Sequence, residues 1–329
     1  MNTLDRRGLK AASAERLRQA PLAQRIILIW AGASAGISLL VSFLSFLLDS
    51  QIELTGGLSG IGLRSVLSTA QSLLSLASMA LLPFWNLGFT ACVLRFVRQE
   101  EAGPRNLLDG FRRFGPALRL MLLRYALYMG LAIGASYVGM IVLSMTPLAM
   151  PLYQLVEDNQ ELFLSGEITE EMILSMMDAM VPMLIGCLVL YVALIIPVSY
   201  RLRLAEFRVM DDPRCGALMA LRESNQRMRR NCVSLFKLDL SFWWYFLAEF
   251  VAAGLCYGDL FLSALGITLP VNADAAFFIF YIIGMAAQVA LLYFRGNYVQ
   301  TTYGLFYQAV SPQKSAPPQE TGNGPTFNL

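Results

Sequence analysis

The sequence contains no histidine at any of its 329 positions. This absence excludes Ser-His-Asp and Cys-His catalysis, histidine metal ligands and histidine-based pH switching. Charged residues make up only 15% of the chain, whereas soluble domains contain about 25%. The chain is 56% hydrophobic and has a mean hydropathy of +0.55, which indicates long apolar runs rather than a globular core. We therefore expect a polytopic membrane protein.

The five cysteines show no CxxC spacing, which leaves zinc-binding and thioredoxin-like interpretations without support. Their odd number and their positions within or beside apolar segments are typical of small buried hydrophobic residues. The sequence also shows no pair of catalytic carboxylates, no thiol beside a base and no metal-ligand spacing. We therefore expect no catalytic residue, no cofactor and no metal site. The cysteines are Cys92, Cys187, Cys215, Cys232 and Cys256.

Six segments reach the length of about 20 apolar residues that a helix needs to cross a bilayer. Helices satisfy their own backbone hydrogen bonds in lipid, so we expect an all-α fold with six spans arranged as three hairpins. A cytoplasmic amphipathic segment, 1–25, precedes the membrane domain, 26–310, and a polar cytoplasmic tail, 311–329, is expected to be disordered. The spans are expected at about 26–48, 66–97, 117–145, 179–200, 240–261 and 275–294.

Charge decides the orientation of these spans. Of the 25 basic residues, the assignment puts 24 on one side of the membrane and leaves only Arg64 on the other. No basic residue occurs between Arg124 and Arg201, whereas seven acidic residues do. The positive-inside rule then puts both termini in the cytoplasm and makes 146–178 an acidic external loop. In that loop we expect one helix at about 151–164 and a second with Thr169 as its N-cap.

Basic segments precede spans one, three and five, and each mixes apolar and basic residues at helical spacing. We interpret them as a repeated helix in the inner headgroup plane, with Leu218 and Met228 opposite Arg222 in the third copy. Membrane lipids with anionic headgroups would bind this face at about 1 kcal/mol per basic residue. Orientation alone also explains the charge, and nucleic-acid binding is not expected because no soluble domain presents these residues. The candidate lipid contacts are Arg112, Arg113, Arg222, Arg229 and Arg230.

Glu249 lies near the middle of span five, where an ionisable group costs about 2.5 kcal/mol or more unless it is paired or hydrated. Two interpretations stay open: a proton or cation site, and the preferred one, a protonated glutamate that ties helices together. The polar neighbours expected from other spans are Asn86, Arg124 and Gln288. Asn86, Gln288 and Tyr200 would form a central ligand site with Glu249 where spans two, four and six meet.

The returning spans two, four and six are interrupted at similar depth by Pro83, Pro197 and Gly284. Corresponding interruptions in repeats can mark a substrate site, but kinks that serve only packing are much commoner. Two GxxxG pairs favour packing inside the monomer over dimerisation, although a homo-oligomer or another membrane-protein partner stays open. These pairs are Gly32 with Gly36 and Gly130 with Gly134.

The segment after span four carries the most specific pattern. The turn Asp211-Asp212-Pro213 is followed by ALRESNQRMRRN at 220–231 and by KLDLSFWW at 237–244. This pattern resembles a bacterial integral membrane family catalogued as domain of unknown function 975. The family motif has an aspartate-proline turn, an A-L-x-x-S-x-x-x-M-x-x-N helix and K/F-L-x-L-S-F-x-x-W. The strong match covers about 200–244, and the Pro-Tyr that commonly closes the family's last span is missing here. The resemblance implies a bacterial cytoplasmic membrane protein and implies no activity.

For function we expect an integral membrane protein with a scaffold, assembly or lipid-organising role. The alternative is a transporter or channel for a small solute, ion or lipid, with a midplane site near Glu249. An intramembrane enzyme is least favoured, because no catalytic constellation is visible. A continuous cavity at the midplane would favour transport, and a fully packed bundle would favour the scaffold.

Overall fold

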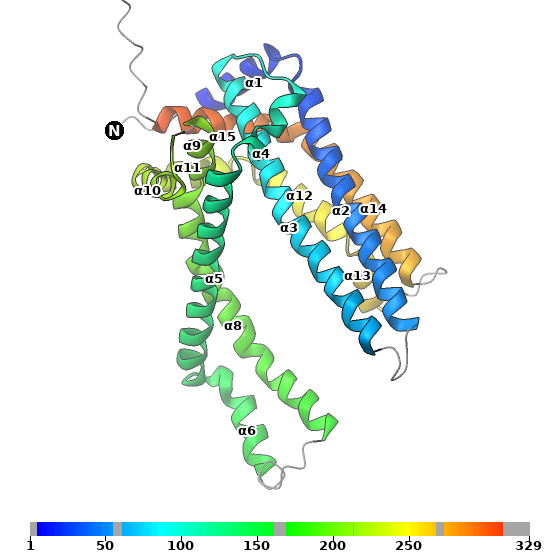
Figure 1. The fold of residues 1–329 in the computed structure, drawn as a ribbon. Coiled ribbons are helices and arrows are strands. Elements are labelled where there is room, and N and C mark those ends of the chain that lie inside the picture. Colours follow the sequence, from blue (N-terminus) through cyan, green and yellow to red (C-terminus); the bar gives the residue numbers. More distant parts are fainter. Residues whose placement is uncertain (1–4, 55–60, 161–168, 213, 268–272, 312–329) are drawn as a thin grey trace, which may run out of the picture. The chain divides into compact units, whose positions relative to one another are not determined.

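The computed structural model describes residues 5–54, 61–160, 169–212, 214–267 and 273–311. The secondary structure within these ranges is helical, with no strand (Figure 1). Contacts between residues divide the chain into two compact units. The split unit consists of Met1–Phe114 and Val233–Leu329, and the inserted unit, Gly115–Cys232, lies between these segments in the sequence. The expected tail, 311–329, lies outside the described residues except for Ser311.

The split unit begins with α1 (Arg6–Arg18), whose N-cap Asp5 accepts a hydrogen bond from the Arg7 N–H. The long helices α2 and α3 then pack side by side as a hairpin (Figure 1). The remaining helices are short or interrupted, apart from α14. In chain order after α1, the unit contains α2 (Ala23–Leu54), α3 (Ile61–Arg98), η2 (Pro104–Leu108), α4 (Asp109–Arg112), α11 (Cys232–Leu240), α12 (Trp243–Leu255), α13 (Gly258–Ala264), α14 (Ala273–Leu291), the π-helical η4 (Leu292–Gly296) and α15 (Asn297–Val310).

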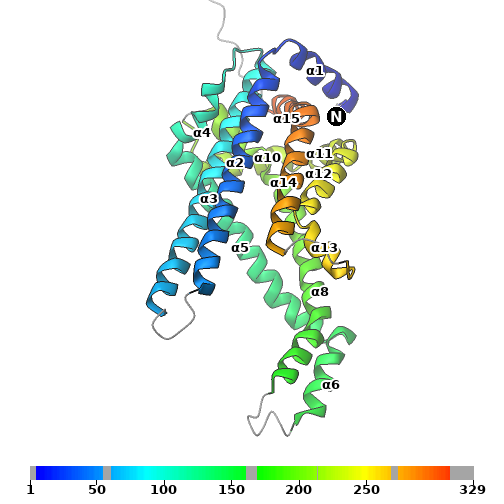
Figure 2. The same cartoon turned by 90° about the vertical axis from the view of Figure 1, so that its right-hand side faces the viewer.

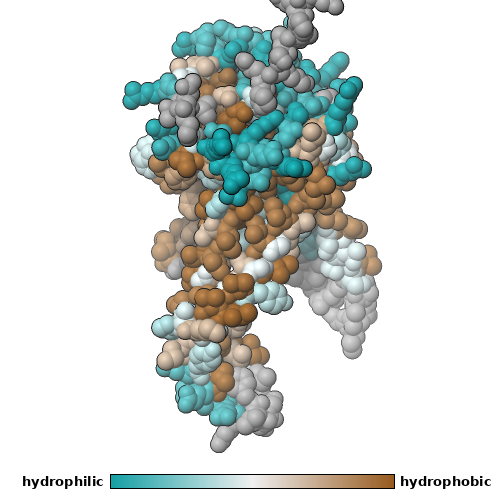
Figure 3. All heavy atoms as spheres, turned by 90° about the vertical axis from the view of Figure 1, so that its left-hand side faces the viewer, coloured by the Kyte–Doolittle hydropathy of each residue, from teal (hydrophilic) through white to brown (hydrophobic). Residues whose placement is uncertain are grey.

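The inserted unit is built on the long apolar helices α5 and α8. Thr169 is the N-cap of α8, as predicted, and its side chain accepts a hydrogen bond from the Met172 N–H at 3.3 Å. The helix expected at Thr169 and the fourth span form one continuous helix, Glu170–Leu202. Much of the surface of α5 and α8 is apolar (Figure 3). The unit contains α5 (Phe114–Ser144), η3 (Pro147–Ala149), α6 (Met150–Asp158), α8 (Glu170–Leu202), α9 (Ala205–Asp211) and α10 (Ala217–Met228).

Five helices in the described ranges are long and apolar enough to cross a membrane. A sixth span is reached only if α11 and α12 are treated as one interrupted span, and the chain bends by 68° between these two helices. The bend arises where the Phe242 N–H donates to the Asp239 carbonyl at 2.8 Å, a bond from residue i to i−3. The Ser241 hydroxyl also donates to the Leu238 carbonyl at 2.6 Å. The regular ladder of helical hydrogen bonds is therefore interrupted close to the predicted start of span five.

Helix α1 packs along α15 in the split unit (Figure 2). Arg6 donates to the Lys237 carbonyl at 3.3 Å, and Lys10 donates to the Ser241 carbonyl at 2.9 Å. The Lys10 ammonium also lies 4.0 Å from the centre of the Phe242 ring. Carbonyl groups at a helix C-terminus carry partial negative charge, so two basic side chains stabilise the end of α11. The first helix of the chain thereby holds the bend between α11 and α12.

Polar side chains are buried on α15. The Tyr303 hydroxyl donates to Asp239 Oδ1 at 2.6 Å, and both residues are at least nine-tenths buried. Asn297 Nδ2 donates to the Ala23 carbonyl at 2.8 Å, which connects α15 to the first turn of α2. Buried polar groups gain most when they are hydrogen-bonded, and these bonds fix how α15 contacts its neighbours. The region is thus a packed core, although α15 belongs to a helix that meets the criteria for a membrane span.

Candidate functional site

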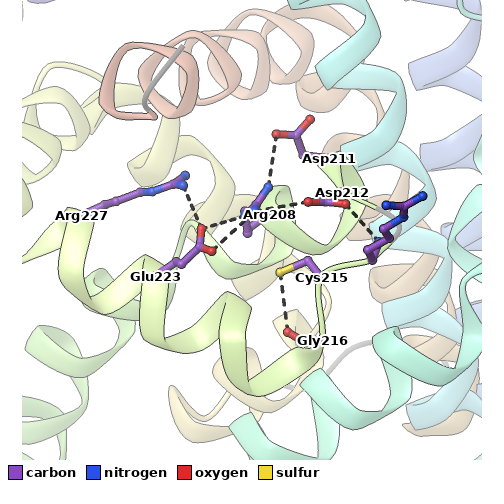
Figure 4. Close-up of polar contacts among 8 residues, drawn as sticks. Arg208, Asp211, Asp212, Cys215, Gly216, Glu223 and Arg227 are labelled. Carbon is purple, nitrogen blue, oxygen red and sulfur yellow. Dashed lines mark hydrogen bonds and ion pairs between the residues drawn. The ribbon is translucent and has the colours of Figure 1, made fainter. Parts of the chain in front are cut away.

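The residues that carry the family-like pattern form a charged cluster in the inserted unit (Figure 4). Arg208 on α9 donates from Nε to Glu223 Oε2 on α10 at 2.8 Å. Arg227 donates to the same carboxylate oxygen at 2.8 Å from the next turn of α10. Arg208 Nη2 also lies 3.3 Å from Asp212 Oδ2, and Arg208 Nη1 lies 4.0 Å from Asp211. We call these five residues the Arg208 cluster.

The side chains of the Arg208 cluster are between 15% and 25% exposed, so they are largely removed from water. Each charged group has an oppositely charged partner, and a buried ion pair needs such partners to offset its desolvation. Ser224 of α10 adds a hydrogen bond of 2.7 Å from its hydroxyl to the Arg201 carbonyl at the end of α8. The cluster therefore ties α9 to α10, Ser224 ties α10 to α8, and the cluster offers no unpaired carboxylate for acid–base chemistry.

The turn between α9 and α10 is ordered by Asp212. Its Oδ1 accepts a hydrogen bond from the Arg214 N–H at 3.0 Å, which is the pattern of an Asx-turn. Cys215 follows, and its thiol is buried and lies 3.6 Å from the Gly216 carbonyl. Burial raises the pKa of Cys215, and the neighbouring Glu223 carboxylate acts in the same direction. A thiol held in its neutral form is a poor nucleophile, so Cys215 is suited to packing.

Within the described residues, no hydrogen bond connects Glu249 to Asn86 or Gln288, the amide residues predicted to lie beside it at the midplane. Asn86 Oδ1 accepts from Trp30 Nε1 at 3.2 Å, and Gln288 Nε2 lies 3.8 Å from Cys256 Sγ. Glu249 is half-buried on α12 and forms no hydrogen bond with either amide. The site around Glu249 therefore stays a prediction.

Tyr200 and Arg124 belong to the inserted unit, whereas Glu249 belongs to the split unit. Arg124 on α5 pairs with Glu206 on α9, and Tyr200 lies half-buried on α8. Arg124 thus has a carboxylate partner within its own unit.

The three interruptions of the returning spans have packing roles or no visible effect on the helix. Pro83 and Pro197 lie inside α3 and α8, which continue through them. Gly284 lies inside α14, and a Cβ built there would be 2.6 Å from the backbone nitrogen of Cys256, the C-cap of α12. This close approach explains the glycine without a ligand. A Cβ added at any glycine of the two GxxxG pairs would meet no atom within 4 Å among the described residues, so these faces are uncovered there.

The candidate lipid contacts are mostly accessible. Arg222 on α10 is exposed, as are Arg229 and Arg230, which follow its last residue. Arg113 is half-buried. Arg112 donates to Asp109 at 3.1 Å but keeps 69% of its side chain exposed. The buried face of α10 consists of Ala217, Ala220, Ser224 and Met228.

One expectation about α10 was wrong. Met228 is buried, but Leu218 is 70% exposed and lies one helical turn before Arg222, on the same face of α10 rather than opposite it. The small residues Ala217 and Ala220 fill the tight contact instead. An exposed leucine beside exposed arginines still gives α10 a surface that is both apolar and basic.

Sequence reasoning missed the pairing roles of Arg208 and Arg227. Glu223 and Arg227 show the i, i+4 spacing of a helical ion pair, which was a usable signal. Arg208 has the same kind of local spacing to Asp211 and Asp212, but its pair with Glu223 on another helix had no local signal. Among the described residues, no group of three or more Cys, Asp or Glu side chains could hold a metal ion.

A family model described as "Protein of unknown function (DUF975)" matches residues 13–314 of the chain. This match covers the Arg208 cluster, the predicted midplane residues and all the candidate lipid contacts. No curated protein and no solved structure matches the chain.

Proposed function

The chain belongs to the DUF975 family of proteins of unknown function, and we propose that it is a non-enzymatic, lipid-organising or assembly scaffold. In this proposal it crosses the bacterial cytoplasmic membrane six times as three hairpins, with both termini in the cytoplasm. Helices α1 and α10 lie in the inner headgroup plane. The basic residues contact anionic lipids there.

The topology is supported by the helices and by the charges that flank them. Five helices are long and apolar enough to span a membrane, and the proposal counts the bent pair α11–α12 as the sixth span. The α6–α8 connection carries only acidic charges, whereas α10 carries several arginines. The positive-inside rule then assigns α10 to the cytoplasm and α6 to the outside.

Cysteine labelling of intact cells tests this topology. Gln160→Cys, near α6, and Gln226→Cys, on α10, replace the same residue type at two exposed positions. We expect an impermeant maleimide to label position 160 from outside and position 226 only after the cells are opened. The unsubstituted protein is the blank, because four of its cysteines are buried. Labelling of position 160 only from the cytoplasmic side would overturn the topology.

The Arg208 cluster is the observation that supports the scaffold role best. Within the most specific motif, Glu223 pairs with Arg227 and with Arg208 of the preceding helix, and these pairs fix the position of α10 against α9. Leu218, Arg222 and Arg229 are left exposed on the same helix. Apolar and basic side chains together are what a helix needs to lie at an anionic lipid surface.

Lipid enrichment around the reconstituted protein tests this role. In bilayers that mix neutral and anionic lipids, we expect anionic lipid to gather near the parent protein. Arg222→Gln/Arg229→Gln should weaken the enrichment, and about 0.5 M salt should reduce it in the parent protein because charges at the surface are screened. The control Asn225→Ala/Gln226→Ala changes exposed, uncharged neighbours on α10 and should have no effect. Equal enrichment in both variants would refute lipid organisation by α10.

Transport remains the second candidate because Glu249 is half-buried in the apolar helix α12. If the protein couples transport to a proton or cation, Glu249→Gln should abolish the coupled flux and leave the folded state nearly unchanged. The assay is solute or ion flux into vesicles that contain the purified protein. Flux that depends on Glu249 would replace the scaffold proposal, and unchanged flux in the variant would remove Glu249 from any transport mechanism.

A further inference from the structure

A cleft of about 950 Å³ lies in the split unit, where the turn between α1 and α2 faces the end of α3 and the start of η2. Its lining combines both signs of charge with amide groups. Arginines reach it from α1, η2 and α4, and two adjacent glutamates follow α3. The polar residues of the lining are Arg16, Arg105, Arg112, Glu100, Glu101, Gln19, Gln99 and Asn106.

Two of the arginines are available to a ligand. Arg16 and Arg105 form no hydrogen bond or ion pair with any residue that the structure describes. They stand on different walls, since Arg16 belongs to α1 and Arg105 to η2. A guanidinium group presents a planar fork of donors that matches the oxygens of a phosphate. Two such groups in one lining supply the donors that a phosphate needs.

The glutamates select against a simple anion. Glu100 and Glu101 are exposed, and in the described part of the chain their carboxylates have no cationic partner. A phosphate alone would be attracted by the arginines and repelled by these carboxylates. A ligand that carries a phosphate and an ammonium group would satisfy both signs of charge. Leu22, which is 41% exposed, adds an apolar contact in the same lining.

A backbone feature marks the same cleft. Gln99 has a φ of +60°, and it is the one non-glycine residue with positive φ in the described chain. The Glu100 N–H closes the end of α3 by donating to the Arg95 carbonyl at 3.0 Å. The left-handed conformation is strained for a non-glycine residue, and such strain concentrates at ligand clamps. The side chain explains why glutamine stands here, because it donates to Gln19 on the other wall.

We propose that this cleft binds a phosphate ester that carries a primary amine, as in the headgroup of an aminophospholipid. The phosphate lies between Arg16 and Arg105, and the ammonium group lies against Glu100 and Glu101. The inference rests on the proposed lipid-organising role and names the lipid class that the split unit recognises. General attraction by basic residues favours acidic lipids, so a preference for a zwitterionic amine-bearing lipid separates this site from that attraction.

Binding to the full-length purified protein tests the proposal by native mass spectrometry. The probes are phosphatidylethanolamine, phosphatidylglycerol, phosphatidylcholine, free phosphoethanolamine and inorganic phosphate. We expect phosphatidylethanolamine to bind best. Arg16→Gln/Arg105→Gln should weaken it about tenfold or more, because charge-assisted hydrogen bonds are lost. The matched control is Arg7→Gln/Arg18→Gln, which removes two exposed arginines of α1 outside the lining and should leave binding unchanged. Glu100→Gln/Glu101→Gln should shift the preference toward phosphatidylglycerol.

The binding results distinguish failure of the cleft proposal from failure of the proposed lipid-organising role. Stronger binding of phosphatidylglycerol, or an equal loss in the control variant, would refute the site and leave anionic-lipid attraction intact. Tight binding of free phosphoethanolamine without the lipid would assign the cleft to a soluble phosphate ester and overturn the lipid proposal. Selective phosphatidylethanolamine binding in a protein that enriches no anionic lipid would support the site while removing the lipid-organising role through α10.

Discussion

The α3 residue Gly88 lies directly against the backbone of η2, and we expect Gly88→Ala to force these two elements apart. A Cβ at this position would be 1.8 Å from the Leu107 carbonyl oxygen and 2.6 Å from its carbonyl carbon. Ordinary contacts of a Cβ begin at about 3.4 Å. Both obstructing atoms belong to the backbone, so no side-chain rotation can relieve the clash. The helix or the loop must therefore move by more than an ångström.

The cost follows from what that movement exposes. Leu107 is fully buried in this contact, and Phe84 is 2% exposed on the same stretch of α3. Overpacking of a core costs about 1–3 kcal/mol, and opening this contact also loses burial of the two side chains. Alanine regains about 1 kcal/mol of helix propensity over glycine. We expect a net destabilisation of about 2–3 kcal/mol.

Thermal unfolding in detergent, followed by loss of the monomer peak in size-exclusion chromatography, measures the effect. Gly32→Ala on α2 is the control, because a Cβ there meets no atom within 4 Å and should be neutral or stabilising. Gly110→Ala meets the Phe84 carbonyl oxygen at 2.0 Å across the same contact. Its effect should be less than additive with that of Gly88→Ala, since the first opening relieves the second. Unfolding of Gly88→Ala at the temperature of the parent protein would refute the reasoning.

Three further predictions concern the polar contacts. Glu223→Gln should destabilise the inserted unit by about 2–3 kcal/mol, because Arg208 loses a largely buried anionic partner; proteolysis of α10 should accelerate in a timed digest. Tyr303→Phe should cost about 1.5–3 kcal/mol by removing the hydroxyl that donates a buried hydrogen bond to Asp239, and unchanged thermal unfolding would contradict this expectation. The raised pKa of Cys215 means that the folded protein carries less Cys215 thiolate at pH 8 than the unfolded chain does, so alkylation of Cys215 should be slower in the folded protein. Equal alkylation rates, measured by mass spectrometry, would contradict the burial of this thiol.

Local patterns in the sequence predicted local features of the fold. Thr169 followed by two glutamates was enough to find the start of α8, because an N-cap depends on neighbouring residues. Apolar length likewise located the long helices α2, α3, α5, α8 and α14. Span five was harder to predict, since the Ser241 carbonyl at its break accepts a hydrogen bond from Lys10, which lies far away in sequence.

In the candidate sites too, contacts between residues close in sequence could be predicted, and contacts that depend on tertiary packing could not. Glu223 and Arg227 are one helical turn apart, so their pairing could be inferred from spacing. The partner Arg208 is positioned by the turn through Asp212, and hydropathy contains no information about that geometry. The cleft beside Gln99 was also invisible in the sequence, because its walls come from segments whose meeting depends on tertiary packing.

The split unit consists of two segments that are far apart in the sequence, and this affects the order in which its contacts form during biosynthesis. Arg6 and its carbonyl partner at Lys237 are separated by 231 residues, and the inserted unit is made between them. At about 5–20 residues per second, the ribosome completes the inserted unit many seconds after α1 has emerged. The residues of the inserted unit can therefore form their contacts before α11 and α15, the packing partners of α1, have been made. Helix α1 is translated before α11 and α15 and must wait for them to form its final contacts.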